Sequence, residues 1–147
     1  MALFHFARAA RTSALLAAGA AVALGCASSA FAASGVALEL NRFEPRDKAC
    51  RISLVANNTT DKALDSLKLD LVFFDKQGVI SRRLAVEAGP LRASKTTVKL
   101  FEATEIACDE VSRVLLNDVT SCGAGAGEDC LALVGVTSRV KDVEFSK

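Results

Sequence analysis

Tryptophan and tyrosine are absent from this 147-residue chain, and histidine occurs once, at His5. Neither sign of charge dominates, because 18 lysine and arginine residues stand against 17 aspartate and glutamate residues. This balance argues against a nucleic-acid-binding protein, which needs a basic excess on one face. Apolar residues make up 51% of the chain and charged residues 24%, which predicts a packed core and excludes general disorder. The length allows one domain behind a leader.

The first 33 residues contain few ionisable side chains and have the order of a secretory signal peptide. His5, Arg8 and Arg11 precede an apolar stretch of alanine, leucine, glycine and valine at 14–25. Small residues follow, and Ala30-Phe31-Ala32 fits the A-x-A cleavage box. We therefore expect a signal peptide at 1–32 and a mature domain at 33–147.

Two other interpretations of this leader are open. The uncharged span 12–38 is long enough for a membrane anchor, but a spanning helix needs about 20 mainly apolar residues. This span is instead rich in alanine, glycine and serine. Leu24-Gly25-Cys26 resembles the end of a bacterial lipobox, so the second alternative is a lipoprotein anchored at Cys26.

Loss of the leader removes His5 and leaves a domain without histidine. Serine-histidine-aspartate and cysteine-histidine sites need an imidazole base, and many zinc and copper sites use histidine ligands. We therefore expect no catalytic residue, metal or cofactor. The remaining cysteines also lack the close pairs of a four-thiolate zinc site. An even number of cysteines in an exported protein predicts disulfides, formed here by Cys50, Cys108, Cys122 and Cys130.

Apolar and polar residues alternate with period two along most of the domain, between clusters of turn residues. Leu69 and Leu71, for example, alternate with Asp70 and Val72. A short helix is predicted at 103–111, where a connection between strands would lie. Short strands joined by hairpin-like turns favour an all-β fold, an immunoglobulin-like antiparallel β-sandwich of about seven strands. The predicted strands are 36–43, 49–56, 67–74, 79–87, 96–101, 112–120 and 131–137.

The direction of the strands selects one of the three disulfide connectivities. In an up-and-down count, the second and sixth strands run the same way. Cys50, which starts the second strand, and Cys108, which precedes the sixth, then lie at one end of the sandwich. Cys122 and Cys130 lie at the other end and flank one hairpin loop. The predicted pairs are Cys50–Cys108 and Cys122–Cys130, because the other pairings exceed the roughly 7 Å limit between Cα atoms.

Residues 54–101 resemble the FxLYD-type immunoglobulin-like module of exported bacterial proteins. The matching features are Asn57-Asn58-Thr59 and the pattern Leu67-x-Leu69-x-Leu71-x-Phe73-Phe74-Asp75-x-x-Gly78, followed by Leu91, Thr96 and Phe101. Phe74 stands where the module usually has tyrosine, and its members mostly lack four cysteines. The whole mature chain is also similar to small exported proteins of proteobacteria. These resemblances imply a fold and carry no catalytic residue.

A partner-binding surface is predicted on three of the strands. The strands at 67–74, 112–120 and 131–137 are neighbours in one sheet of an immunoglobulin-type sandwich. Each carries apolar residues on both faces, which predicts an apolar outer patch for a protein partner. The alternative is that the short helical turn or the N-terminal segment covers this face. The residues of the predicted patch are Val72, Phe74, Leu115 and Leu133.

These observations favour a non-catalytic, exported β-sandwich, periplasmic or secreted, that binds an unknown protein of the cell envelope and no nucleic acid. One alternative is a small hydrolase or enzyme inhibitor that uses carboxylates. A hydrolytic pair would need two carboxylates about 5 to 10 Å apart in a cleft, and Asp109 and Asp118 are the candidates. The other alternative is a lipid-anchored envelope scaffold attached through Cys26.

Overall fold

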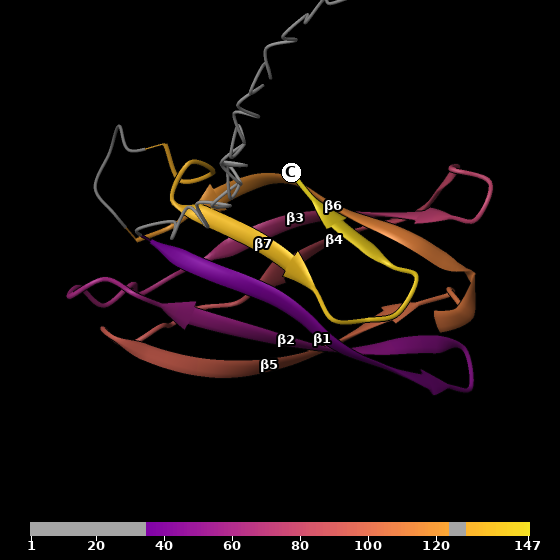
Figure 1. Ribbon diagram of the computed structural model, residues 1–147, viewed down its shortest axis with the longest axis horizontal. Coiled ribbons are helices and arrows are strands. Elements are labelled where there is room, and N and C mark those ends of the chain that lie inside the picture. The colour runs from indigo at the N-terminus through magenta and orange to yellow at the C-terminus, as the bar shows by residue number, and fades with distance from the viewer. Residues whose placement is uncertain (1–34, 124–128) are drawn as a thin grey trace, which may run out of the picture. The chain divides into compact units, whose positions relative to one another are not determined.

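Eight strands in two sheets account for most of residues 35–123 and 129–147, the part of the chain that the computed structural model describes. The predicted signal peptide, its cleavage site and Cys26 lie outside these residues, as does the segment 124–128. The first sheet has the order β5-β2-β1-β7 (Figure 1). Its strands are β1 (Val36–Arg46), β2 (Ala49–Asn58), β5 (Lys95–Thr104) and β7 (Val134–Ser138).

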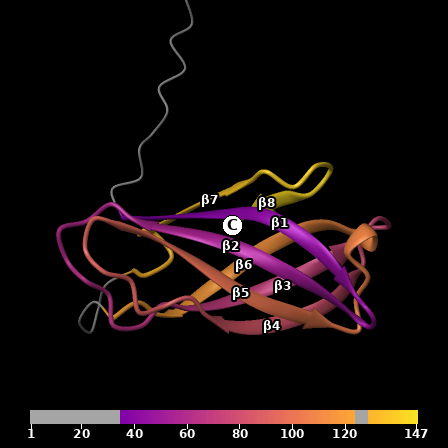
Figure 2. The ribbon, with the colours of Figure 1, turned by 90° about the horizontal axis from the view of Figure 1, so that it is seen from below.

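The second sheet has the order β4-β3-β6-β8 and packs face to face with the first (Figure 2). Its strands are β3 (Lys68–Asp75), β4 (Ile80–Glu87), β6 (Val111–Ser121) and β8 (Glu144–Ser146). Each sheet is mixed, because β7 pairs in parallel with β1 and β8 pairs in parallel with β6. The predicted all-β sandwich is confirmed, but its sheets are not antiparallel throughout as predicted, because β7 and β8 each join a sheet in parallel. The short strand β8 adds to the seven strands that were predicted.

Alternation along the strands builds the core between the two sheets. In β2, Cys50, Ile52 and Leu54 are completely buried, whereas the residues between them face outward and keep some exposure. Burying one such leucine or isoleucine side chain contributes about 1.5–3 kcal/mol. The largest side chains with less than 2% exposure are Phe73, Leu38, Leu40, Ile52, Leu54, Leu67, Leu69, Leu71, Leu91 and Leu116.

Both predicted disulfides are present. Cys50 in β2 is joined to Cys108, which opens the 3₁₀ turn η1 (Cys108–Glu110) leading into β6. Cys122, directly after β6, is joined to Cys130, which precedes β7. The Cα atoms lie 4.9 Å and 5.6 Å apart, within the range that a disulfide spans. The predicted directions of the strands, on which this pairing depended, are therefore confirmed.

The predicted place of the seventh strand is wrong. β7 lies in the first sheet, beside β1, and β8 is the second neighbour of β6. After Cys122 the chain crosses from the second sheet to the first, where Val134 and Val136 stand in register with Val36 and Leu38. The apolar inner face of β1 continues onto β7 in this way, so the crossing buries more of the core. Cys122 and Cys130 consequently link two sheets and do not close a hairpin.

The helix predicted at 103–111 is also wrong. Ala103 and Thr104 are the last residues of β5, and Ala103 is completely buried opposite Cys50. A turn at Glu105, which has a φ of 62°, ends the strand. The three residues of η1 are the helical part of this connection. The alternation of β5 thus extends three residues beyond the range predicted from the sequence.

Candidate functional site

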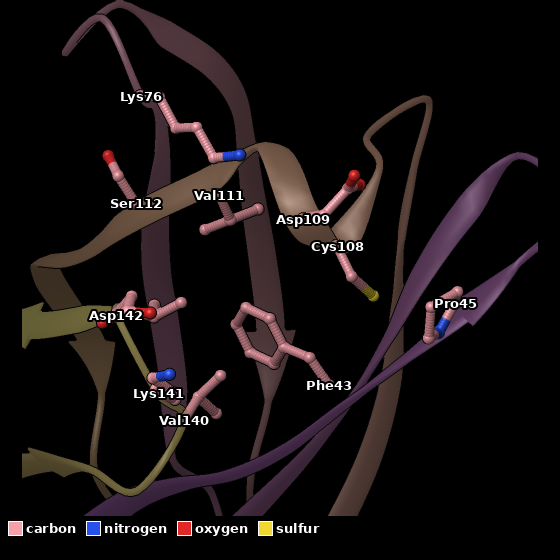
Figure 3. A pocket seen from close by; sticks show the side chains of 11 residues that line it. Phe43, Pro45, Lys76, Cys108, Asp109, Val111, Ser112, Val140, Lys141 and Asp142 are labelled. Carbon is pink, nitrogen blue, oxygen red and sulfur yellow. The ribbon is translucent and has the colours of Figure 1, made fainter.

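A cleft of about 480 Å³ opens at the end of the sandwich where β1 ends and β6 begins (Figure 3). The Phe43 ring lies between Val111 and Val140 in this view, so the cleft has an apolar wall. Its remaining lining comes from the end of β1, the β3–β4 turn, η1, the start of β6 and the connection between β7 and β8. These residues are Pro45, Lys76, Cys108, Asp109, Ser112, Lys141, Asp142 and Val143.

The charged residues of this cleft do not form a fixed constellation. Lys76, Asp109, Lys141 and Asp142 are all exposed, and none of them belongs to an ion pair within the described ranges. Two positive and two negative side chains also leave the rim without net charge. The cleft can accept an apolar group, but its charges are not held in place for a defined ligand.

The two carboxylates considered for acid–base chemistry are not brought together. Asp109 lines the cleft, whereas Asp118 lies in β6 opposite Asp70 and is not part of the lining. Seven residue steps along β6 separate Val111 from Asp118, a distance of about 23 Å at about 3.3 Å per residue. This separation is too large for the pair of carboxylates that glycoside hydrolysis requires.

Three of the four predicted patch residues lie together on the outer face of the second sheet. Val72 of β3 stands opposite Leu115 of β6, and Phe74 is the next outward residue of β3. The guanidinium of Arg113 lies 4.0 Å above the centre of the Phe74 ring, in a cation–π contact. Val72 is 6% exposed and Phe74 and Leu115 are half-buried. The face therefore offers less apolar surface than its sequence predicts.

Leu133, the fourth residue of the predicted patch, is not on this face. It precedes β7 in the first sheet, packs against the core, and its carbonyl oxygen accepts a hydrogen bond of 2.9 Å from the Val36 N–H. The expectation that it joins Val72, Phe74 and Leu115 is wrong, because β7 is not a neighbour of β6. The predicted surface therefore exists only in part.

A polar network occupies the same outer face beside Val72. Arg83 of β4 donates two hydrogen bonds, of 2.8 Å and 2.7 Å, to the carboxylate of Asp70, and Asn117 donates a third of 2.6 Å. The hydrogen bonds from Arg83 are the main reason that the pKa of Asp70 lies below its ordinary value of 3.8, although burial opposes this shift. Asp70 is thus an ionised, 8% exposed residue whose partners surround it.

The most exposed apolar side chains of the strands lie elsewhere, on β4 and β5. In β5 the usual alternation is inverted: Val98 is 59% exposed and Leu100 is 65% exposed, whereas Thr97 and Lys99 face the core side. Val98 stands opposite Val55 of β2, so the three apolar residues are adjacent on the outer face of the first sheet. We call Val55, Val98 and Leu100 the β5 surface.

The two ends of the β5 surface are closed by polar contacts. Arg51 donates hydrogen bonds of 3.1 Å and 2.9 Å to Glu102 at one end. Thr96 donates a hydrogen bond of 3.2 Å to Asn57 at the other. An apolar centre with a polar rim is the common anatomy of a protein-binding surface. The alternation at 96–101 was visible in the sequence, but the sequence did not tell which of its two faces is buried.

A groove of about 230 Å³, lined by residues of β4 and β5, lies beside this surface. The two strands run along the same side of the sandwich (Figure 2). Leu84 and Val86 line it from β4, and Lys99 and Phe101 line it from β5. Arg82 bridges the two sheets at one end, through hydrogen bonds of 2.7 Å to Glu105 and 2.9 Å to Thr104. The groove therefore follows two strand edges and is closed at this end by the Arg82 bridge.

Within residues 35–123 and 129–147, the structure has no group of histidine, cysteine, aspartate and glutamate side chains that could hold a metal ion. The same residues include no helix long and apolar enough to cross a membrane. The chain matches no protein-family model, no curated protein and no solved structure. Its fold and surfaces define a disulfide-bonded, two-sheet β-sandwich with an apolar surface on an edge strand.

Proposed function

We propose that this protein is an exported, non-catalytic β-sandwich that binds another protein of the cell envelope, in the periplasm or after secretion. The observation that carries this proposal is the inverted alternation of β5, which leaves Val98 and Leu100 exposed while Lys99 faces inward. Exposing two large apolar side chains next to each other has no benefit for the folded chain in water, since burial of such residues is favourable. A partner that covers them supplies that benefit.

The two disulfides support the location. Structural disulfides form and persist outside the cytosol, in the periplasm or in secreted proteins, and this chain pairs Cys50 with Cys108 and Cys122 with Cys130. A leader at 1–32 that directs export agrees with them. The resemblance to an immunoglobulin-like module of exported bacterial proteins agrees with a binding role, since such sandwiches present their faces and edges to other molecules.

Two outer faces compete for the partner, and the first sheet is favoured over the second. On the second sheet, Arg113 covers Phe74 and the Asp70 network adjoins Val72. On the first sheet, Val98 and Leu100 are exposed for more than half of their surface. A contact there removes more apolar area from water, which is the main source of affinity at the centre of an interface.

Photo-crosslinking in the producing cell tests this function. A photoreactive amino acid at position 100 is expected to form a covalent adduct with a single envelope protein. The matched control carries it at Thr137, which is exposed on the same face but lies on β7. The variant with Val98→Asp and Leu100→Asp is expected to lose partner capture but to stay folded, at a cost of about 1–2 kcal/mol, because both side chains are mostly exposed and aspartate is disfavoured in strands. Equal adducts at positions 100 and 137, or capture by the aspartate variant, would contradict the proposal.

A further inference from the structure

The outer edge of β5 has no strand beside it in the described part of the chain, and the Arg82 bridge reaches only its last residue, Thr104. β5 pairs with β2 at every position from Lys95 to Thr104 without a bulge, and no described strand pairs with its other side. The remaining edge strands are shorter or irregular: β4 has a register shift, β7 has five residues and β8 has three. Proteins usually blunt exposed edges with short strands or bulges, because an unpaired row of N–H and C=O groups templates further pairing.

A strand added at this edge would continue the alternation of the first sheet. Its outward side chains would lie beside Val98 and Leu100, and the side chain between them would point inward beside Lys99. The outward positions favour apolar residues, since they extend the β5 surface. The kind of residue favoured at the inward position of the added strand depends on the charge of Lys99.

The ammonium group of Lys99 has no acidic partner in the described part of the chain. Its Nζ donates a hydrogen bond of 2.7 Å to the carbonyl oxygen of Gly89, and no ion pair there includes it. The two carboxylates that line the same groove are already engaged. Glu102 accepts from Arg51, and Glu87 accepts from the N–H groups of Leu67 and Gly89. The half-buried charge of Lys99 is therefore available to an acidic side chain from outside.

We propose that β5 pairs along its open edge with an extended segment of the partner protein, and that this segment carries an acidic side chain opposite Lys99 between two apolar ones. This inference rests on the proposed function and names the chemistry of its partner. The inward lysine also disfavours strands that are uncharged or basic at this position, because a buried ammonium opposite them is left unpaired or repelled.

The same charge argues against a second copy of this chain as the partner. Antiparallel pairing of two β5 strands with Val98 opposite Leu100 places Lys99 opposite the Lys99 of the second copy. Like charges directly opposite in neighbouring strands are destabilising. A segment with the order apolar, acidic, apolar meets the same apolar neighbours without this repulsion.

Two synthetic peptides test the inference on the purified, oxidised protein. Threonine and valine alternate over nine residues in both, and the central threonine is replaced by glutamate in one peptide and by lysine in the other. Fluorescence anisotropy at low salt is expected to show at least about tenfold tighter binding of the glutamate peptide, because one charge attracts Lys99 and the other repels it. The Lys99→Glu variant is expected to reverse this preference.

Substitution of Lys99 also removes its hydrogen bond to the Gly89 carbonyl oxygen, which could disturb the fold. Hydrogen exchange on the unsubstituted protein gives a second measurement that avoids this effect. The glutamate peptide is expected to protect alternate amides of β5 and to leave those of β4 unchanged. Equal affinity for the two peptides, protection outside β5, or a dimer in sedimentation that Leu100→Asp dissociates would each overturn the inference. Either of the first two results, together with a partner adduct at position 100, would overturn this inference but leave the proposed function standing. If the adduct at position 100 is also absent, the proposed function falls as well.

Discussion

Asp70 shows what a single residue decides on the outer face of the second sheet. Its position between Leu69 and Leu71 predicts an outward, solvated carboxylate, yet the residue is 8% exposed. Arg83 and Asn117 approach it from the two neighbouring strands and replace the water that it loses. A buried carboxylate is tolerated where charge-assisted hydrogen bonds satisfy it.

We expect Asp70→Asn to lower the free energy of unfolding by about 1–2 kcal/mol at pH 7, since it removes charge-assisted hydrogen bonds. The pKa of Asp70 is lowered in the folded protein, so its contribution to stability is complete above the pKa of the unfolded state. It is lost as the pH falls through the folded-state pKa. Urea unfolding at pH 7 and in steps below pH 4 should therefore show the variant and the natural protein converging in acid.

Glu144→Gln is the matched control for this prediction. Glu144 is an exposed acid on β8 of the same sheet, and it belongs to no ion pair within the described residues. Its substitution is expected to leave both the stability at pH 7 and the acid slope nearly unchanged. A stability difference for Asp70→Asn that stays constant from pH 7 into acid would show that the ion pair is not its cause.

At the scale of the element, β3 and β6 show how bulges alter a period-two pattern. The sequence places Leu115 and Val119 on the same face of one strand, but the register of β6 against β3 shifts between Leu116 and Asp118. The extra residue turns Val119 inward, where it joins the core at 6% exposure. Residues keep alternating on either side of a bulge, but beyond it the residues that would have pointed outward point inward.

The adjacent residues Phe73 and Phe74 of β3 point to opposite faces of the second sheet, so substituting each one tests which face is buried. Phe73 is completely buried between the sheets and Phe74 is half-buried under Arg113. We expect Phe73→Ala to cost about 3–5 kcal/mol of unfolding free energy, because it leaves a cavity in the core. Phe74→Ala should cost about 1–2 kcal/mol, the smaller loss of partial burial and one cation–π contact. Chemical denaturation of both variants measures this, and equal losses would mean that the assigned faces are incorrect.

At the scale of the whole molecule, the two disulfides act on different loops. The first closes a loop with a sequence separation of 58 residues and ties β2 to the start of β6. The second has a separation of 8 and ties the end of β6 to the approach of β7. A longer closed loop removes more conformational entropy from the unfolded chain, so the first disulfide should contribute more.

We expect the double variant Cys50→Ala, Cys108→Ala to lose about 4 kcal/mol and Cys122→Ala, Cys130→Ala about 2.5 kcal/mol on the chain-entropy account. The first loss is comparable to the whole stability of a small domain. Urea unfolding of the two double variants under the same conditions measures the order. A larger loss for the short loop would show that strain or native packing, and not loop closure, governs the contribution of these bonds.

Much of the fold followed from local pattern. Alternation between turn residues located seven strands, because burial alternates along each strand. Counting strand directions paired Cys50 with Cys108 and Cys122 with Cys130, because the chain reverses at each connection and the direction of a strand can therefore be counted along the sequence. The candidate surface followed only in part. Val72, Phe74 and Leu115 do share one face, but the exposed residues Val98 and Leu100 lie on a strand whose alternation alone does not show which face is covered.

The sequence by itself determined seven of the eight described strands, the disulfide pairs and the absence of histidine after residue 5. Only the tertiary structure decided which strands are neighbours, and so moved β7 with Leu133 to the first sheet and left the edge of β5 open. The physical reason is that a period-two pattern records how each strand meets the core. Which strands are neighbours within a sheet depends instead on where the chain crosses from one sheet to the other. Contacts between residues that are distant in the sequence decide this.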